Sequence, residues 1–236
     1  MENKTTESTV FLLDVDNTLL DNDTAQADYI AEIRRVVSPK AAQRYWEIFQ
    51  DVARELGYAD YLGALQRYRV EDRHDPKLLH VSSYLLDYDF TARLYPQALA
   101  VIAYLHEQGD VAIFTDGDVV FQPRKIVHAG LWDAVAGKIL ICIHKEQELH
   151  QVERRFPAQH YVMVDDKLRL LAAIKRHWEE RVTTVFVRQG HYAADPAALA
   201  DYPPADITLE QIGDLMNYDV TTMRHVARPH NGPKEK

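Results

Sequence analysis

Polar side chains that can do chemistry recur in this chain directly after short apolar runs. Apolar runs of this length, bounded by turn residues, are typical of buried strands. If the strands are parallel, their carboxyl ends meet at one edge of the sheet, and ligands of such sheets bind beyond that edge. The residues at these ends are Asp14, Asp16, Asn17 and Thr18 after the first run, Thr115, Asp116, Gly117 and Asp118 after the second, Lys145 after the third, and Asp165, Asp166 and Lys167 after the fourth.

Together these residue types predict a site for a divalent cation and a phosphate group. Crowded carboxylates repel one another, and Mg²⁺, which favours one or two carboxylates plus waters and a substrate phosphate, relieves that repulsion. Lys145 and Thr115 can hold phosphate oxygens. A carboxylate can also attack phosphorus and form an aspartyl-phosphate that water cleaves. The cation would screen the approach of one anion to another.

The rest of the sequence shows two patterns, one of alternating elements and one of helices alone. Alternation predicts an α/β fold: a Rossmann-like (flavodoxin-like), doubly wound parallel sheet with helices on both faces. Residues 22–92 carry only helix-period stripes, such as Tyr45, Ile48 and Phe49, and predict an α-helical insertion. The alternating elements are strands at 10–15, 111–115, 139–143, 161–164, 182–187 and 206–209, and helices at 96–107, 121–129, 145–155 and 168–178.

Composition and charge narrow the classes of partner. The chain has 236 residues and a formal net charge of -9, so it would repel phosphate-rich polymers and anionic lipid. We therefore expect no nucleic-acid polymer and no membrane among its partners. Cys142 is the single cysteine, which excludes an intramolecular disulfide. The polar start of the chain and the lack of a run of about 18 apolar residues predict a cytoplasmic protein.

The strand-end residues resemble the motifs of the haloacid dehalogenase superfamily. The segment FLLDVDNTLL, with Asp14, Asp16 and Thr18, is similar to the first motif: an aspartate, any residue, an aspartate, any residue and a threonine. Asp-x-Asp alone is common, but here four motifs follow in order on successive predicted strands over about residues 9–190. The later matches are Thr115 for the second motif, Lys145 for the third, and Asp165 with Asp166 for the fourth.

The resemblance implies roles for the residues of the first two motifs. Asp14 would be the nucleophile and a metal ligand. Asp16 would be the general acid and base, and its main-chain carbonyl would also bind Mg²⁺. Thr115 and the backbone amide of Asp116 would hold the phosphoryl oxygens. Gly117 would let the backbone approach the phosphate.

The later motifs supply the remaining charges. Lys145 would pair with Asp14 and the phosphate, with Lys138 as the alternative lysine, although Lys138 opens a strand at the end away from the site. Asp166 would be the main metal aspartate and Asp165 a second acidic member of the site. Asp165 could instead cap the helix that follows. The turn Thr-Asp-Gly-Asp departs from the common Ser/Thr-Asn-Gly, so the roles of Asp116 and Asp118 stay open.

The resemblance also implies a domain plan and an activity. Residues 1–21 and 93–236 would form the catalytic core, and residues 22–92 a helical cap of the kind that closes over small substrates. The implied activity is that of a Mg²⁺-dependent phosphomonoesterase with a small phosphorylated metabolite as its substrate. In the cap, Arg67, Arg69, Arg73 and His74 are candidates for a substrate pocket, and a solvated helix face is the simpler interpretation.

Other functions remain open from the sequence. A dehalogenase of the same fold needs neither a metal nor an acid at the position of Asp16. A phosphonatase would need a lysine from the cap, where Lys40 and Lys77 are available. A phosphomutase would use the same chemistry with a sugar in place of water. Outside the enzymes, the fold could serve a non-catalytic binding or regulatory protein.

Overall fold

Six parallel strands form one sheet in the computed structural model, which describes residues 8–71 and 75–227. The spatial order is β3-β2-β1-β4-β5-β6, so the chain winds outward from β1 in one direction and then in the other. This confirms the doubly wound, Rossmann-like sheet, and the order is the Rossmann one, whereas a flavodoxin has the order 2-1-3-4-5. The strands are β1 (Thr9–Leu13), β2 (Asp110–Asp116), β3 (Ile139–Cys142), β4 (His160–Asp165), β5 (Val182–Val187) and β6 (Ile207–Leu209).

Strand register brings the expected site residues to one edge. Leu13, the last residue of β1, is level with Ile113 of β2 and Val164 of β4. The winding reverses between β1 and β4, and ligands of open α/β sheets bind at such a reversal. Asp14 follows directly after β1 and therefore lies at this point.

Helices cover both faces of the sheet because the strand residues alternate between them. Phe11 and Leu13 pack on one face, and Val10 and Leu12 pack on the other. The first face is covered by α5 (Ala98–His106), α6 (Phe121–His128), α7 (Leu131–Ala134), the 3₁₀ turn η4 (Ile212–Asn217) and α12 (Val220–Val226). The second is covered by α8 (Leu149–Arg155), α9 (Leu168–Trp178) and α10 (Gly190–Ala194), with α11 (Pro196–Ala200) following α10. Short 3₁₀ turns are η1 (Phe90–Arg93), η2 (Lys145–Gln147) and η3 (Glu179–Arg181).

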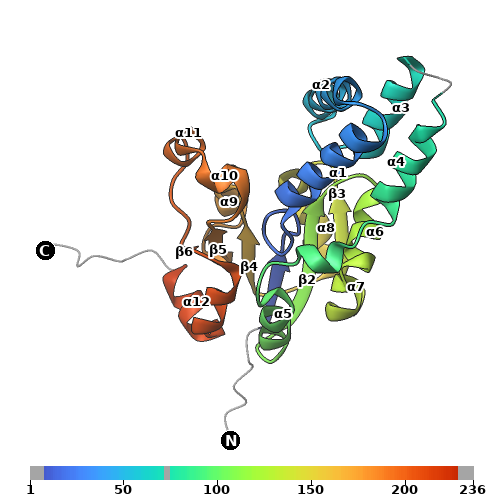
Figure 1. The fold of residues 1–236 in the computed structure, drawn as a ribbon. Coiled ribbons are helices and arrows are strands. Elements are labelled where there is room, and N and C mark those ends of the chain that lie inside the picture. The colour runs from blue at the N-terminus through green and yellow to red at the C-terminus, as the bar shows by residue number, and fades with distance from the viewer. Residues whose placement is uncertain (1–7, 72–74, 228–236) are drawn as a thin grey trace, which may run out of the picture.

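In the described part of residues 22–93, the chain forms four α-helices and the 3₁₀ turn η1, joined by short loops. Figure 1 shows these helices gathered as a group beyond one end of the sheet. Ser38 caps α2 by accepting a hydrogen bond from Ala41 N, and Gly57, with φ +80°, ends it. The predicted stripe of α2 is buried. The helices are α1 (Asn22–Val36), α2 (Pro39–Leu56), α3 (Tyr61–Glu71) and α4 (Lys77–Leu86).

Charged residues of this helical segment mostly face solvent. Arg67 pairs with Glu55 at 2.7 Å, with both side chains exposed, which fits the simpler interpretation of a solvated face. Lys40 and Lys77 are exposed. Arg73 and His74, and the tail 228–236 for which the sequence predicts disorder, lie outside the described residues. No helix in the described part of the chain is long and apolar enough to cross a membrane.

Candidate active site

The loop after β1 turns back sharply and buries Asp14. The carbonyl of Val15 accepts hydrogen bonds from the amides of Thr18, Leu19 and Leu20 at 3.3, 2.9 and 3.0 Å. Asn17 takes the left-handed conformation, φ +61°, that this turn requires. The hydroxyl of Thr18 thereby reaches Asp14 Oδ2 at 3.2 Å. The Asp-x-Asp-x-Thr spacing therefore lets the loop orient its own first carboxylate.

Lys145 lies beside Asp14 at the centre of the site. Its amine donates a hydrogen bond to Asp14 Oδ1 at 2.5 Å, and it lies 2.5 Å from Asp165 Oδ2, outside hydrogen-bond geometry. Burial alone would lower the pKa of Lys145, but Asp14, Asp165 and Asp116 outweigh it and raise that pKa well above its usual range. Lys138, the alternative lysine, instead pairs with Asp110, the first residue of β2, at 2.6 Å.

Three buried carboxylates form an acidic trio at the edge of β1 and β4. Asp14, Asp165 and Asp166 each offer an oxygen atom within 4.8 Å of the others. Both oxygens of Asp166 are buried without a hydrogen-bond partner, and burial raises the pKa of Asp166 well above its usual range. Oxygen ligands of this kind, otherwise unsatisfied, fit Mg²⁺.

Asp165 lies at the site and forms a turn just before α9. Its Oδ1 accepts the amide of Lys167 at 2.8 Å, but Lys167 is the N-cap residue of α9 and no side chain caps that helix, so the helix-cap alternative for Asp165 is wrong. Its Oδ2 faces Lys145. The Lys167 amine lies 4.8 Å from the centre of the Tyr192 ring, a cation–π contact with the segment after β5.

The end of β2 is tied to the segment after β3. Asp116 Oδ1 accepts the backbone amide of Lys145 at 2.7 Å, which fixes the start of η2. Burial raises the pKa of Asp116 to about 6. Thr115 is 1% exposed, and its hydroxyl accepts from Gln122 Nε2 at 3.1 Å. Asp116 thus has a structural partner, which answers part of the question left open by the sequence.

Gly117 and Asp118, the next two residues of this turn, lead into α6. Asp118 Oδ1 accepts the amides of Val120 and Phe121 at 2.9 and 2.7 Å. A Cβ at Gly117 would lie 2.8 Å from the Gln122 Cβ. Glycine is therefore required here by close packing against Gln122.

Asp16 is held from the side of α6. Its carboxylate accepts hydrogen bonds from Lys125 Nζ at 2.7 and 2.9 Å, and its side chain is 25% exposed. Gln122 Nε2 lies 3.5 Å from Asp16 Oδ2. We did not single out Lys125 or Gln122 from the sequence. The available signal was their spacing of three on the helix expected after the second strand, which places both on one helix face.

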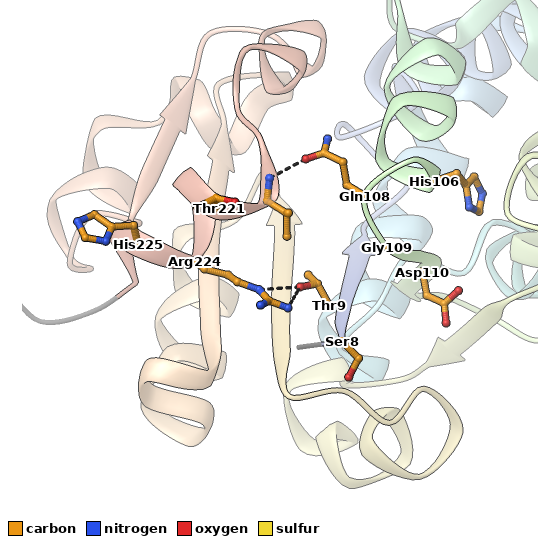
Figure 2. A pocket seen from close by; sticks show the side chains of 10 residues that line it. Ser8, Thr9, His106, Gln108, Gly109, Asp110, Thr221, Arg224 and His225 are labelled. Carbon is orange, nitrogen blue, oxygen red and sulfur yellow. Dashed lines mark hydrogen bonds between the residues drawn. The ribbon is translucent and has the colours of Figure 1, made fainter. Parts of the chain in front are cut away.

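A large cavity lies away from these residues. It has a volume of about 700 Å³ and borders Thr9 and Asp110, which open β1 and β2, so it lies at the amino ends of the strands. In Figure 2, Arg224 donates to Thr9 Oγ1 at 2.8 Å, and Gln108 accepts from the Val220 amide at 2.6 Å. These contacts dock α12 against the sheet, and the candidate site is at the other end.

The structure defines a Rossmann-like α/β protein with buried carboxylates at the point where the strand order reverses. The family model for haloacid dehalogenase-like hydrolases matches residues 9–177, and the chain belongs to that family. A search among curated proteins found no match.

Solved structures agree with this assignment. A haloacid dehalogenase-like hydrolase from Burkholderia xenovorans LB400 is 57% identical, with a TM-score of 0.87 over 91% of this chain and 100% of the other. The HAD-hydrolase YfnB from Bacillus subtilis, solved with magnesium, is 16% identical, with a TM-score of 0.60 over 89% and 98% of the two chains. The L-2-haloacid dehalogenase from Xanthobacter autotrophicus is 15% identical, with a TM-score of 0.58 over 89% and 97%. The last two similarities concern the fold alone.

Proposed function

We propose that the chain is a magnesium-dependent phosphomonoesterase that acts on a small phosphorylated metabolite through an aspartyl-phosphate on Asp14. The observation that carries the proposal is the acidic trio, in which Asp166 keeps two buried carboxylate oxygens without a partner. Attack of a carboxylate on a neutral carbon–halogen centre needs no cation. Attack on a phosphate dianion does, because both reactants are negatively charged.

Bond making and breaking would involve the two aspartates of the first loop. An oxygen of Asp14 attacks phosphorus, the bond to the leaving oxygen breaks, and Asp16 gives that oxygen a proton. Water then attacks phosphorus and loses a proton to Asp16. The bond between phosphorus and Asp14 breaks, which releases phosphate and restores the carboxylate. One carboxyl can serve both steps, because the first leaves it ionised for the second.

The neighbouring residues would bind and orient the reacting groups. Mg²⁺, bound by Asp14, Asp165, Asp166 and the Asp16 carbonyl, would neutralise charge on the phosphate. Lys145 holds Asp14 and would pair with a phosphate oxygen, as an ammonium at 2.5 Å from the nucleophile is placed to do. The Thr115 hydroxyl and the Asp116 amide would hold the other oxygens.

Residues 22–92 would act as a cap over this site. Asn22 opens α1 and bonds to Lys125 of α6 at 2.9 Å, so the helical segment meets the core beside Asp16. A small apolar cavity lies there, lined by Tyr29, Tyr61, Phe90 and Phe121 among others. Its volume of about 10 Å³ holds no more than a water molecule, so the helical segment would have to move away from the core to admit a substrate.

The product that is released, phosphate or halide, distinguishes this proposal from dehalogenation. The purified protein would be assayed for phosphate release from a panel of alkyl and aryl phosphates, with Mg²⁺ and with EDTA, and for halide release from L-2-chloropropionate. We expect Mg²⁺-dependent phosphate release that Asp14→Asn abolishes, and no halide. Halide release, or phosphate release that survives EDTA, would contradict the proposal.

A further inference from the structure

Lys125 is a second buried lysine at the site, and none of the four motifs includes it. It projects from α6, is 1% exposed, and donates to both oxygens of Asp16 at 2.7 and 2.9 Å. Among the described residues, no hydrogen bond or ion pair joins it to Asp14, whose lysine is Lys145. Each carboxylate of the Asp-x-Asp pair therefore has its own lysine, from a different element of the core.

The surroundings of Lys125 leave its amine few polar partners. Beyond Asp16, it donates to Asn22 Oδ1 at 2.9 Å. The rings of Tyr61, Phe90 and Phe121 lie around it, with centroids 5.9, 6.0 and 5.5 Å from Nζ. Burying an ammonium among apolar groups is unfavourable unless a carboxylate balances it. Asp16 is therefore the main electrostatic partner of this lysine.

We propose that Lys125 is the positioning residue of Asp16, fixing the carboxyl at the leaving-group side of the site during both steps of hydrolysis. This inference rests on the proposed function, in which Asp16 is the acid and base. Two hydrogen bonds from one amine fix the orientation of the carboxyl plane. Without them Asp16, which is two residues from Asp14, is free to turn toward a cation at the acidic trio.

The hydrogen bond from Lys125 can persist when Asp16 carries a proton, although the charge balance of the ion pair is then lost. In this structure Lys125 donates to both oxygens of Asp16. The protonated carboxyl keeps one oxygen as an acceptor, so the amine can hold it while the other oxygen carries the proton. Gln122, one turn earlier on α6, lies 3.5 Å from Asp16 Oδ2 and supports the same orientation.

The test is a double-mutant cycle with two leaving groups. Wild type, Lys125→Met, Asp16→Asn and the double variant would be compared on para-nitrophenyl phosphate and on an alkyl phosphate, with circular dichroism to check folding. Lys125→Gln, which is uncharged and one bond too short to keep both hydrogen bonds to Asp16, is the second variant should methionine prevent folding. Lys175→Met is the matched control. Lys175 lies on α9, pairs with Asp206 at 2.8 Å and donates a hydrogen bond to the carbonyl of Val182, the first residue of β5, at the end of the sheet away from the site.

Lys125→Met should lower kcat for the alkyl phosphate about ten- to hundredfold, less than full loss of the acid–base group. The loss should be smaller on para-nitrophenyl phosphate, and KM should change less than about threefold. When Lys125→Met is added to Asp16→Asn, kcat for the alkyl phosphate should fall no further.

An undiminished rate in Lys125→Met or Lys125→Gln overturns the inference. So does an equal loss with both leaving groups, or an equal loss in the Asp16→Asn background. A wild type without phosphatase activity overturns the proposed function and this inference with it. An active wild type with an unaffected Lys125→Met overturns this inference alone.

Discussion

Replacing Lys145 by methionine removes one charge from the centre of the site and keeps most of the side-chain volume. The lysine is 1% exposed, and the side chains of Asp14 and Asp165 that face it are 4% and 0% exposed. Without the ammonium, two buried carboxylates lose their compensating charge. Breaking a buried ion pair by removing one partner typically costs about 3–5 kcal/mol of folding free energy.

Lys138 is the matched control, because it is also a lysine paired with a single aspartate. Its side chain is 37% exposed and that of Asp110 is 66% exposed, at the end of β2 away from the site. A surface pair of this kind contributes about 0–1 kcal/mol. Lys145→Met should thus lose several kcal/mol more than Lys138→Met.

Urea unfolding followed by circular dichroism in EDTA measures this difference directly. Phosphate release with Mg²⁺ measures the catalytic effect, where loss of a group that stabilises developing charge lowers kcat about 10²–10³-fold. We expect Lys138→Met to keep wild-type turnover. Equal stabilities for the two variants, or activity lost in Lys138→Met and kept in Lys145→Met, would refute the reasoning.

Three further predictions concern the other acidic residues. Asp16→Asn should fold and bind Mg²⁺ but lose about 10²–10⁴ in turnover, most with alkyl leaving groups; undiminished hydrolysis of an alkyl phosphate would contradict this. Mg²⁺ at about 100 times its Kd should raise the unfolding free energy by about 2.7 kcal/mol, and Asp166→Asn should remove that gain in a thermal shift assay. Because burial raises the pKa of Asp116 from 3.8 to about 6, its ionisation destabilises the fold as pH rises through this window. In metal-free urea titrations, Asp116→Asn should gain up to about 3 kcal/mol over wild type above about pH 6 and nothing below about pH 4; a gain independent of pH would contradict the assignment.

Elements with strong apolar patterns were predictable from the sequence. The helix expected at 168–178 and the strand at 182–187 match α9 and β5, because apolar periodicity and flanking charges mark both ends. The short helix α12, which buries only Met223, was not predicted, and α3 was predicted only as part of the helical segment 22–92. The helix expected at 145–155 is divided into η2 and α8, because Asp116 holds the amide of Lys145 and sets a separate turn there.

The sequence predicts which residues come together at the strand ends. It does not predict which of them form hydrogen bonds or ion pairs with one another. Parallel strands necessarily bring Asp14, Thr115 and Asp166 to one edge. The partner of Asp16 depends on how α6 packs against the loop after β1, which no local pattern encodes. Lys125 has an apolar environment and a charged side chain, so its pairing is visible only in three dimensions.

Trapping the phosphoenzyme tests the central claim most directly. Wild type and Asp14→Asn would be mixed with a substrate from the phosphate panel and Mg²⁺, quenched in acid within the first turnover, and digested for mass spectrometry. We predict a phosphoryl group on the peptide that contains Asp14 in the wild type, and none in the variant. Steady phosphate release with no phosphorylated Asp14, or phosphorylation at another residue, would contradict the account.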